Sequence, residues 1–172
     1  MKFRILFISI VLGFLATNSF HAQTVCTWTG TTDTDWDKPA NWTTTVGGAP
    51  AASAKPTNLS DVIIPNSITN YPVVGSGTCV AKDVTLNANG GTSNPLLTIS
   101  SGRTLNIEGD FLMSGGTLVF QNSTFNCAGS WNDVSGALNM QGTSTVNLDG
   151  NGTVSKNSAA TSDFIFLNIS GN

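Results

Sequence analysis

Two carboxylates at matching positions of a repeated segment come nearest to an enzymatic pattern in this chain. Glu108 and Asp149 each follow an asparagine by two residues, in the segments TLNIEG and TVNLDG. If those segments form equivalent strands two layers apart, the carboxylates lie roughly 9 to 10 Å from each other. The acid and base of an inverting glycosidase are about 6.5 to 9.5 Å apart. Asp110 lies close to Glu108, but Ala128 holds the matching position between them, so scattered acids on a solvated face explain the pattern equally well.

A run of alternating acids nearer the N-terminus begins like a calcium-binding loop. Asp33, Asp35 and Asp37 would supply oxygens at the first, third and fifth positions. The sixth position is Lys38 where an EF-hand has glycine, and the twelfth is Thr44 where it has a bidentate glutamate. The run is therefore not an EF-hand, and both a looser calcium site and a solvated turn remain open.

Three tryptophans in the same region allow two interpretations. Trp28, Trp36 and Trp42 stand close together in the sequence, with Tyr71 further along. If exposed, such rings could stack on sugars and form a carbohydrate platform. If buried, they would fill the core of a structure that closes one end of the fold.

Histidine and cysteine usage narrows the chemistry further. The single histidine, His21, falls in a predicted leader, so the mature chain lacks the base of Ser-His-Asp and Cys-His catalysis. No phosphate-binding glycine motif is present, and we expect no cofactor. Of the three cysteines, Cys26 and Cys79 are the expected disulfide in an oxidising compartment, because both precede the repeats. Burial of all three cysteines, Cys127 included, as small apolar residues is equally consistent.

Residues 1–22 have the features of a secretory signal peptide. Lys2 and Arg4 precede an apolar stretch, 5–15, that is too short to span a bilayer, and Ala22 is the expected cleavage position. We therefore expect an exported chain without a membrane span. Loss of the leader leaves five basic residues against ten acidic ones, a net charge of −5. This balance argues against binding to nucleic acid or to an anionic membrane surface.

One six-residue motif, x-φ-N-φ-x-G with φ apolar, recurs through the second half of the chain. Its starts are separated by 19, 20, 21 and 21 residues. The copies are 85–90, 104–109, 124–129, 145–150 and 166–171. Period-two alternation would turn the apolar residues inward and the asparagines outward on strands. The asparagines expected to stack in one ladder are Asn87, Asn106, Asn126, Asn147 and Asn168.

Such strands cannot bury their apolar sides alone, but stacked coils can. The repeats therefore predict an all-β fold, a parallel β-helix of about five coils of ~20 residues, with right-handed winding as the commoner sense. A second landmark supports the register, because Ile99, Leu118 and Leu138 each follow a motif glycine by nine residues. A β-sandwich is the alternative, but Asn-Gly turns occur only at 89–90 and 151–152.

The outward residues of the motif suggest a possible binding strip. Thr85, Thr104, Thr124 and Thr145 would form a file beside the asparagines. Asn106, Asn126 and Asn147 could then bind a glycan or order water. The amides could equally satisfy one another along the stack.

The residues before the repeats have a different composition. Five of the six prolines lie between Pro39 and Pro72. We assign 23–80 to an N-terminal cap and a first strand, 61–65, and 81–172 to the β-helix. A cap is needed because the end of a β-helix exposes unpaired strand edges and an open core, which the tryptophans could fill.

The run WTGTTDTDWDKPANW, followed by SDVIIPNSITNYPVV and the repeats, resembles the N-terminal module of large secreted surface proteins of Bacteroidetes-type bacteria. The later STVNLDGNGTVSK and DFIFLNIS resemble β-helix coils of the same proteins. Many of them end in a type IX sorting domain, and their β-helices resemble those of filamentous-haemagglutinin-type adhesins.

This resemblance implies a secreted or cell-surface structural or adhesive module, and no catalytic residue. Because the chain stops at Asn172, directly after a motif glycine, we expect it to be the front of a longer adhesin-like protein. The expected partners are glycans or other cell-surface components, or a second copy through end-to-end association. The alternatives are a carbohydrate-active β-helix enzyme, either a polysaccharide hydrolase or a lyase, and a glycan-binding module.

Overall fold

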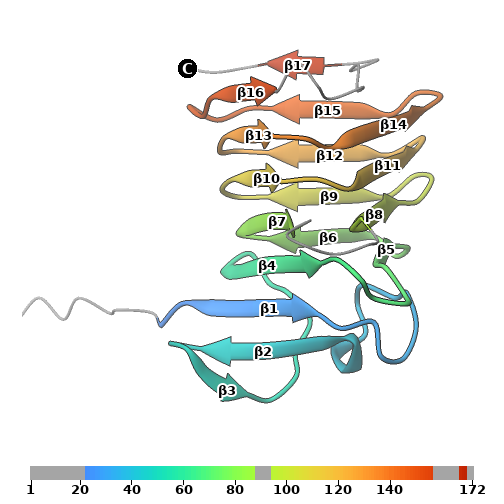
Figure 1. Cartoon of the computed structure of the whole chain (residues 1–172). Helices are drawn as coiled ribbons and strands as arrows, with labels where there is room; N and C mark the ends of the chain where they lie inside the picture. The colour runs from blue at the N-terminus through green and yellow to red at the C-terminus, as the bar shows by residue number, and fades with distance from the viewer. Residues whose placement is uncertain (1–21, 88–93, 157–166, 170–172) are drawn as a thin grey trace, which may run out of the picture.

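The computed structural model describes residues 22–87, 94–156 and 167–169, which are built almost wholly from short strands (Figure 1). Within these ranges the one helical element is a 3-10 turn, η1 (Pro39–Asn41). The strands are β1 (Thr24–Trp28), β2 (Trp42–Val46), β3 (Ala49–Ala51), β4 (Ser60–Pro65), β5 (Val73–Val74), β6 (Thr78–Ala81), β7 (Asp83–Asn87), β8 (Leu96–Ile99), β9 (Thr104–Ile107), β10 (Phe111–Met113), β11 (Thr117–Gln121), β12 (Thr124–Cys127), β13 (Trp131–Asp133), β14 (Ala137–Gln141), β15 (Thr145–Leu148), β16 (Val154–Lys156) and β17 (Leu167–Ile169).

The strands wind into a three-sided parallel β-helix, which confirms the predicted fold class. The first face has the order β16-β13-β10-β7-β4-β1, the second β14-β11-β8-β5, and the third β17-β15-β12-β9-β6. Each turn of the chain adds one strand to each face. Four complete coils are described, β4–β6, β7–β9, β10–β12 and β13–β15, and β16 and β17 belong to the next.

The third face carries the repeated motif in register. Thr104, Thr124 and Thr145 stand opposite one another on β9, β12 and β15. The asparagines two residues later are also aligned, and Asn168 of β17 continues their row. The prediction is thus confirmed for the last four copies, over their described residues.

The copy at 85–90 was assigned to the wrong face. Its described residues lie on β7 of the first face, where Thr85 pairs with Ile63 and Leu112. The third-face partner of Thr104 is Thr78, and the partner of Asn106 is Val80, so Asn87 is not part of the ladder. Alternation of apolar residues decides which side chains point inward, but it does not decide which of three faces a strand joins.

The landmark at Ile99 was misplaced for the same reason. Leu118 pairs with Leu138 as predicted, but its other partner is Leu97, and Ile99 pairs with Phe120. The prediction counted nine residues from Gly90, in the copy that belongs to the first face. Strand β8 is therefore offset by two residues from the predicted alignment, whereas β11 and β14 are aligned as predicted.

The interior is filled by the inward residues of all three faces. The inward motif residues of β9, β12 and β15 are 0 to 5% exposed, as predicted. In the middle of the stack Phe111 lies between Phe125 (ring centroids 5.2 Å apart) and Trp131 (4.5 Å), which joins two faces and two successive coils. In the last described strand the equivalent Leu167 and Ile169 are 36% and 66% exposed.

An aromatic cap closes the N-terminal end of the stack. Strand β1 pairs in parallel with β4, but its other edge pairs antiparallel with β2, which in turn pairs with β3 (Figure 1). Trp42 stands edge-on to Trp28 at 4.8 Å and to Trp36 at 5.0 Å. All three indoles are 1% exposed. The first complete coil begins at β4, inside the segment 23–80 that the sequence assigns to the cap and first strand.

One carboxylate occupies an interior position of the first face. Asp133 on β13 stands between Met113 and Lys156 in adjacent coils and is 1% exposed. Its Oδ1 accepts a hydrogen bond from the Gly136 N–H (2.8 Å), whereas the buried Oδ2 has no partner in the described structure. The pKa of Asp133 is raised, because burial has the largest effect on it. The Gly136 hydrogen bond and the Lys156 charge lower the pKa but do not outweigh burial.

We expect Ile107→Asp to unfold neighbouring coils and Asn106→Ser to cost little. The aspartate would bury an unpaired charge, at a cost of several kcal/mol. The serine would remove one side-chain hydrogen bond, worth about 1 kcal/mol. Urea unfolding followed by circular dichroism distinguishes the two variants. Equal stability of both variants and the wild type would show that the inside and outside assignments are wrong.

Asp133→Asn should stabilise the fold at neutral pH by about 1 kcal/mol, because it removes a buried charge and keeps the acceptor for Gly136. A carboxyl whose folded pKa is raised destabilises the fold above that pKa. This penalty disappears below the ordinary aspartate pKa of 3.8. The gain should therefore vanish at pH 3 in urea titrations. Exposed Asp149→Asn is the control, and a loss of stability in Asp133→Asn at neutral pH would contradict the expectation.

Candidate functional site

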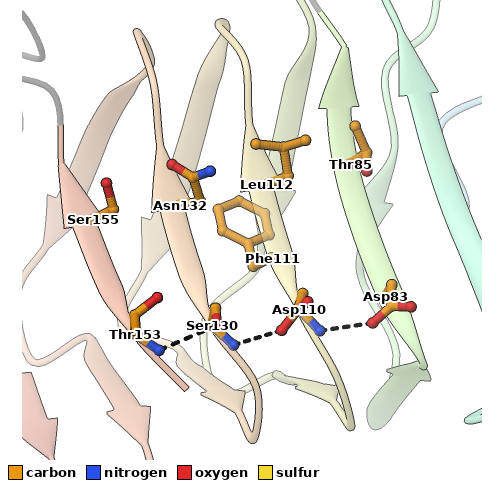
Figure 2. Close-up of a pocket in the computed structure, with 9 residues that line it drawn as sticks. All are labelled: Asp83, Thr85, Asp110, Phe111, Leu112, Ser130, Asn132, Thr153 and Ser155. Carbon is orange, nitrogen blue, oxygen red and sulfur yellow. Dashed lines mark hydrogen bonds between the residues drawn. The ribbon is translucent and has the colours of Figure 1, made fainter.

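The first face carries a groove bounded by two rows of side chains (Figure 2). One row comes from the outward residues of β7, β10, β13 and β16. These residues are in register from coil to coil, and in β7, β10 and β13 their neighbours on both sides are buried. The row consists of Thr85, Leu112, Asn132 and Ser155.

The second row lies at the corner where the chain enters the first face. Here a side chain of one coil accepts a hydrogen bond from the backbone of the next. Asp83 Oδ1 accepts from the Asp110 N–H (2.7 Å), and Asp110 Oδ1 accepts from the Ser130 N–H (2.7 Å). Ser130 Oγ accepts in turn from the Thr153 N–H (3.1 Å). We call this row, Asp83, Asp110, Ser130 and Thr153, the corner ladder; its bonds hold the row in place (Figure 2).

The groove between the rows has a volume of about 460 Å³. Its floor includes Phe111, whose ring points into the core and is fully buried. The walls combine carboxylates, hydroxyls, one amide and the aliphatic Leu112. Of the nine described residues that line it, none is basic. Such a surface can accept and donate hydrogen bonds along the solenoid.

Asp83 is held ionised at one end of the corner ladder. Burial raises its pKa, but the Asp110 N–H and the Lys82 ammonium outweigh burial, and the net pKa is lowered. Lys82 Nζ lies 3.0 Å from Asp83 and 3.2 Å from Asp61 of the preceding coil. Those two carboxylates raise the pKa of Lys82. Lys82, which does not line the groove, thus balances the charges of Asp61 and of Asp83, which does.

The predicted carboxylate pair lies on the same corner, between the third and first faces, but does not line this groove. The Glu108 N–H donates to Ala81 O (3.1 Å) and the Asp149 N–H to Cys127 O (3.3 Å), so the two residues hold equivalent positions two coils apart. Ala128 stands between them, with its N–H bonded to Ile107 O. Both carboxylates are exposed. Their stacking matches the sequence expectation, and a catalytic role for them stays a prediction.

The asparagine ladder of the third face is confirmed for four residues. Asn126 Nδ2 donates to Asn106 Oδ1 (2.7 Å), Asn147 to Asn126 (2.6 Å) and Asn168 to Asn147 (2.9 Å). The amides therefore serve the stack itself, which supports the structural interpretation of Asn106, Asn126 and Asn147. Ligand binding by this strip stays a prediction.

The tryptophans cannot form the alternative sugar platform, because Trp28, Trp36 and Trp42 are buried. Their indole N–H groups are also used within the cap. Trp28 Nε1 donates to Asn70 O (2.6 Å), and Trp42 Nε1 donates to Trp36 O (2.8 Å). The interpretation as cap core is confirmed.

The acidic run is a hydrogen-bonded turn. Asp33 accepts from Lys38 Nζ and from Asn41 Nδ2, both at 2.7 Å, and these bonds, led by that of Lys38, lower the pKa of Asp33 to about 2. Asp35 Oδ1 accepts from the Asp37 N–H (3.0 Å).

Asp37 pairs with Lys55 (2.8 Å) and accepts a hydrogen bond from Ser76. Among the described residues, no cluster of three or more His, Cys, Asp or Glu side chains could hold a metal ion. Each carboxylate of the run turns to its own partners, and calcium binding by Asp33, Asp35 and Asp37 stays a prediction.

The three cysteines are buried free thiols, so the predicted Cys26–Cys79 disulfide is absent. Cys26 lies on the first face and contacts Ala54 O (3.8 Å), whereas Cys79 lies on the third and contacts Ser76 O (3.7 Å). Burial, together with Asp37, raises the pKa of Cys79 to about 12, and burial raises that of Cys127 to about 11. Both thiols are thus protonated at neutral pH, in line with the alternative of small buried residues.

Sequence reasoning missed the corner ladder, although a signal for it exists. Each of its members directly precedes an apolar residue at the start of a first-face strand, and the first three of these apolar residues are buried. The pairs are Asp83-Val84, Asp110-Phe111, Ser130-Trp131 and Thr153-Val154. A small side chain that accepts hydrogen bonds, placed directly before a large apolar residue and shortly after the motif, would have located this corner. It would also have placed 78–84, rather than 85–90, beside 104–111.

Comparison of the chain with protein-family models, with curated proteins and with solved structures finds no match. Among the described residues, no helix is long and apolar enough to cross a membrane. Residues 1–21 of the predicted leader lie outside the described ranges. What the chain does is therefore inferred from its own geometry.

Trp36→Ala should destabilise the fold by about 3 to 5 kcal/mol, because it leaves a cavity beside Trp42 in the cap. Urea unfolding monitored by tryptophan fluorescence measures the change. Leu59→Ala, at a position that is 61% exposed, is the control and should change stability by less than about 0.5 kcal/mol. Unchanged stability of Trp36→Ala would show that the tryptophans do not hold the cap together.

Proposed function

We propose that this chain is a structural and adhesive module of a secreted or cell-surface protein. The observation that carries the proposal is the use of repeated polar side chains to bind one coil to the next. The asparagine ladder does so on the third face, and the corner ladder does so beside the first. Polar residues used in this way stiffen a scaffold, as expected for a stalk that presents a surface.

Export is the second part of the proposal. Its support is the leader-like segment 1–22, with a basic start and a short apolar stretch. The resemblance of the cap region and coils to secreted surface proteins points the same way. The high share of small polar residues and the low share of charged residues, 10%, suit an extended β-solenoid outside the cell.

The end of the stack away from the cap supports attachment to something further. Val154, Leu167 and Ile169 are 44%, 36% and 66% exposed in the last described coil. Their equivalents in the preceding coils are buried. We propose that another coil stacks here, from a longer adhesin-like chain or from a second copy that joins end to end.

The proposed role is non-catalytic. The stacked Glu108 and Asp149 are the nearest approach to a catalytic pair, with Ala128 between them. Release of sugar reducing ends by the folded chain, abolished in Glu108→Gln, would contradict this part of the proposal.

Expression of the full chain in a Gram-negative bacterium tests the proposal. The product should be exported and begin at Gln23 by mass spectrometry. Leu12→Arg, which interrupts the apolar part of the leader, should leave an uncleaved precursor inside the cell. If the wild-type chain stays in the cytoplasm, whether or not it is cleaved, the export proposal is wrong.

The adhesive part is tested with beads that carry the purified mature chain. They should adhere to surfaces coated with cell-surface polysaccharides or matrix proteins. Beads carrying the Ile107→Asp variant are the matched control, because that variant should lose the folded solenoid. Equal adhesion by both kinds of bead would contradict an adhesive role for the folded chain.

A further inference from the structure

We propose that the groove on the first face binds a neutral polysaccharide, with its chain running along the axis of the solenoid. This inference rests on the proposed adhesive role, and it gives that role a site and a ligand class. The groove is separate from the asparagine strip of the third face and from the buried tryptophans.

The repeat of the groove suits a polymer of sugars. Each coil adds one corner-ladder residue and one outward residue, two positions apart in the same stretch of chain. The four pairs are Asp83 with Thr85, Asp110 with Leu112, Ser130 with Asn132, and Thr153 with Ser155. Successive coils are about 4.8 Å apart, close to the length of one hexose in an extended chain. Each sugar would therefore meet an equivalent pair of side chains.

The chemistry of the walls matches sugar hydroxyls. Asp110 is exposed and uses Oδ1 for the Ser130 N–H. Its Oδ2 has no donor among the described residues and can accept from a hydroxyl of the ligand. The exposed Asn132 amide can both donate and accept. Figure 2 shows it beside Leu112, whose aliphatic side chain can contact the C–H face of a sugar ring.

The charge of the groove selects a neutral chain over an anionic one. Two carboxylates line it, none of its nine described lining residues is basic, and Lys82 is held by Asp61 and Asp83. A uronate or sulfate group would face Asp83 and Asp110 without a cation to pair with. The volume of about 460 Å³ lies within the range of small-ligand sites, about 300 to 1,000 Å³. Its lining residues come from four successive coils, so the groove runs along the axis, as a polymer requires.

The experiment measures binding of the purified mature chain to insoluble neutral polysaccharides, namely cellulose, chitin and a β-1,3-glucan, with alginate as the anionic comparison. Asn132→Ala should weaken binding to the preferred neutral polysaccharide about 3- to 10-fold, the effect of one lost hydrogen bond. Asn139→Ala is the matched control, because Asn139 is, like Asn132, an exposed asparagine of the fourth coil but lies on β14 of the second face. Circular dichroism confirms that both variants are folded.

Retention on a neutral polysaccharide, weakened by Asn132→Ala and unchanged by Asn139→Ala, supports the inference. Absence of binding to every neutral polysaccharide, tighter binding to alginate, or equal effects of the two substitutions would overturn it. In the bead assay, adhesion that persists without polysaccharide binding would sink this inference alone. Loss of both export and bead adhesion would instead count against the proposed function.

Discussion

The four complete coils that the structure describes are joined to one another by parallel strand pairing on three faces at once, and the other features depend on that register. Because the pairing brings equivalent positions into line, inward residues meet as a continuous core and outward residues meet as ladders. Asn126 can bond to Asn106 only because β12 and β9 are aligned residue for residue. The same alignment acts at the corner before the first face, where Asp110 Oδ1 accepts a hydrogen bond from the Ser130 N–H of the next coil.

The corners preserve this register where coil lengths differ. Before the third-face strands the chain passes through a left-handed conformation at Gly77, Gly102, Asn122 and Gly142, with φ between 39° and 69°. Glycine adopts it without strain, and asparagine is among the residues that tolerate it best. At Gly142 a side chain would collide with Asn122 of the coil below. The turn therefore repeats at each level although the connection between the second-face and third-face strands varies in length.

The fold was predictable from sequence because apolar residues alternate along each strand and the motif recurs at a nearly constant interval. Both patterns are typical of stacked coils. Leu105, Ile107 and Phe125 could be assigned to the core, and Asn106 and Asn126 to the outer ladder, without a structure.

The face of each strand was harder to predict. Thr85 begins a segment that matches the motif, yet Val84 and Leu86 fill the core from the first face just as well. The groove was missed because its two rows come from residues on either side of a buried position, and no single motif contains them. The burial of Trp36 was open until the cap hairpin was known to cover it.

The position of the cap has a consequence for how the molecule is made. The closed end, with its three tryptophans and the β1–β2 hairpin, lies at the N-terminal side of every coil. A ribosome, or a translocation channel that releases the N-terminus first, delivers that end before any repeat. The cap can then act as a template, since each arriving coil needs only the edge already formed beneath it. In such vectorial assembly, only the coil formed last has unpaired strand edges at its growing end. It also requires no disulfide, because the three thiols are buried without bonding to one another.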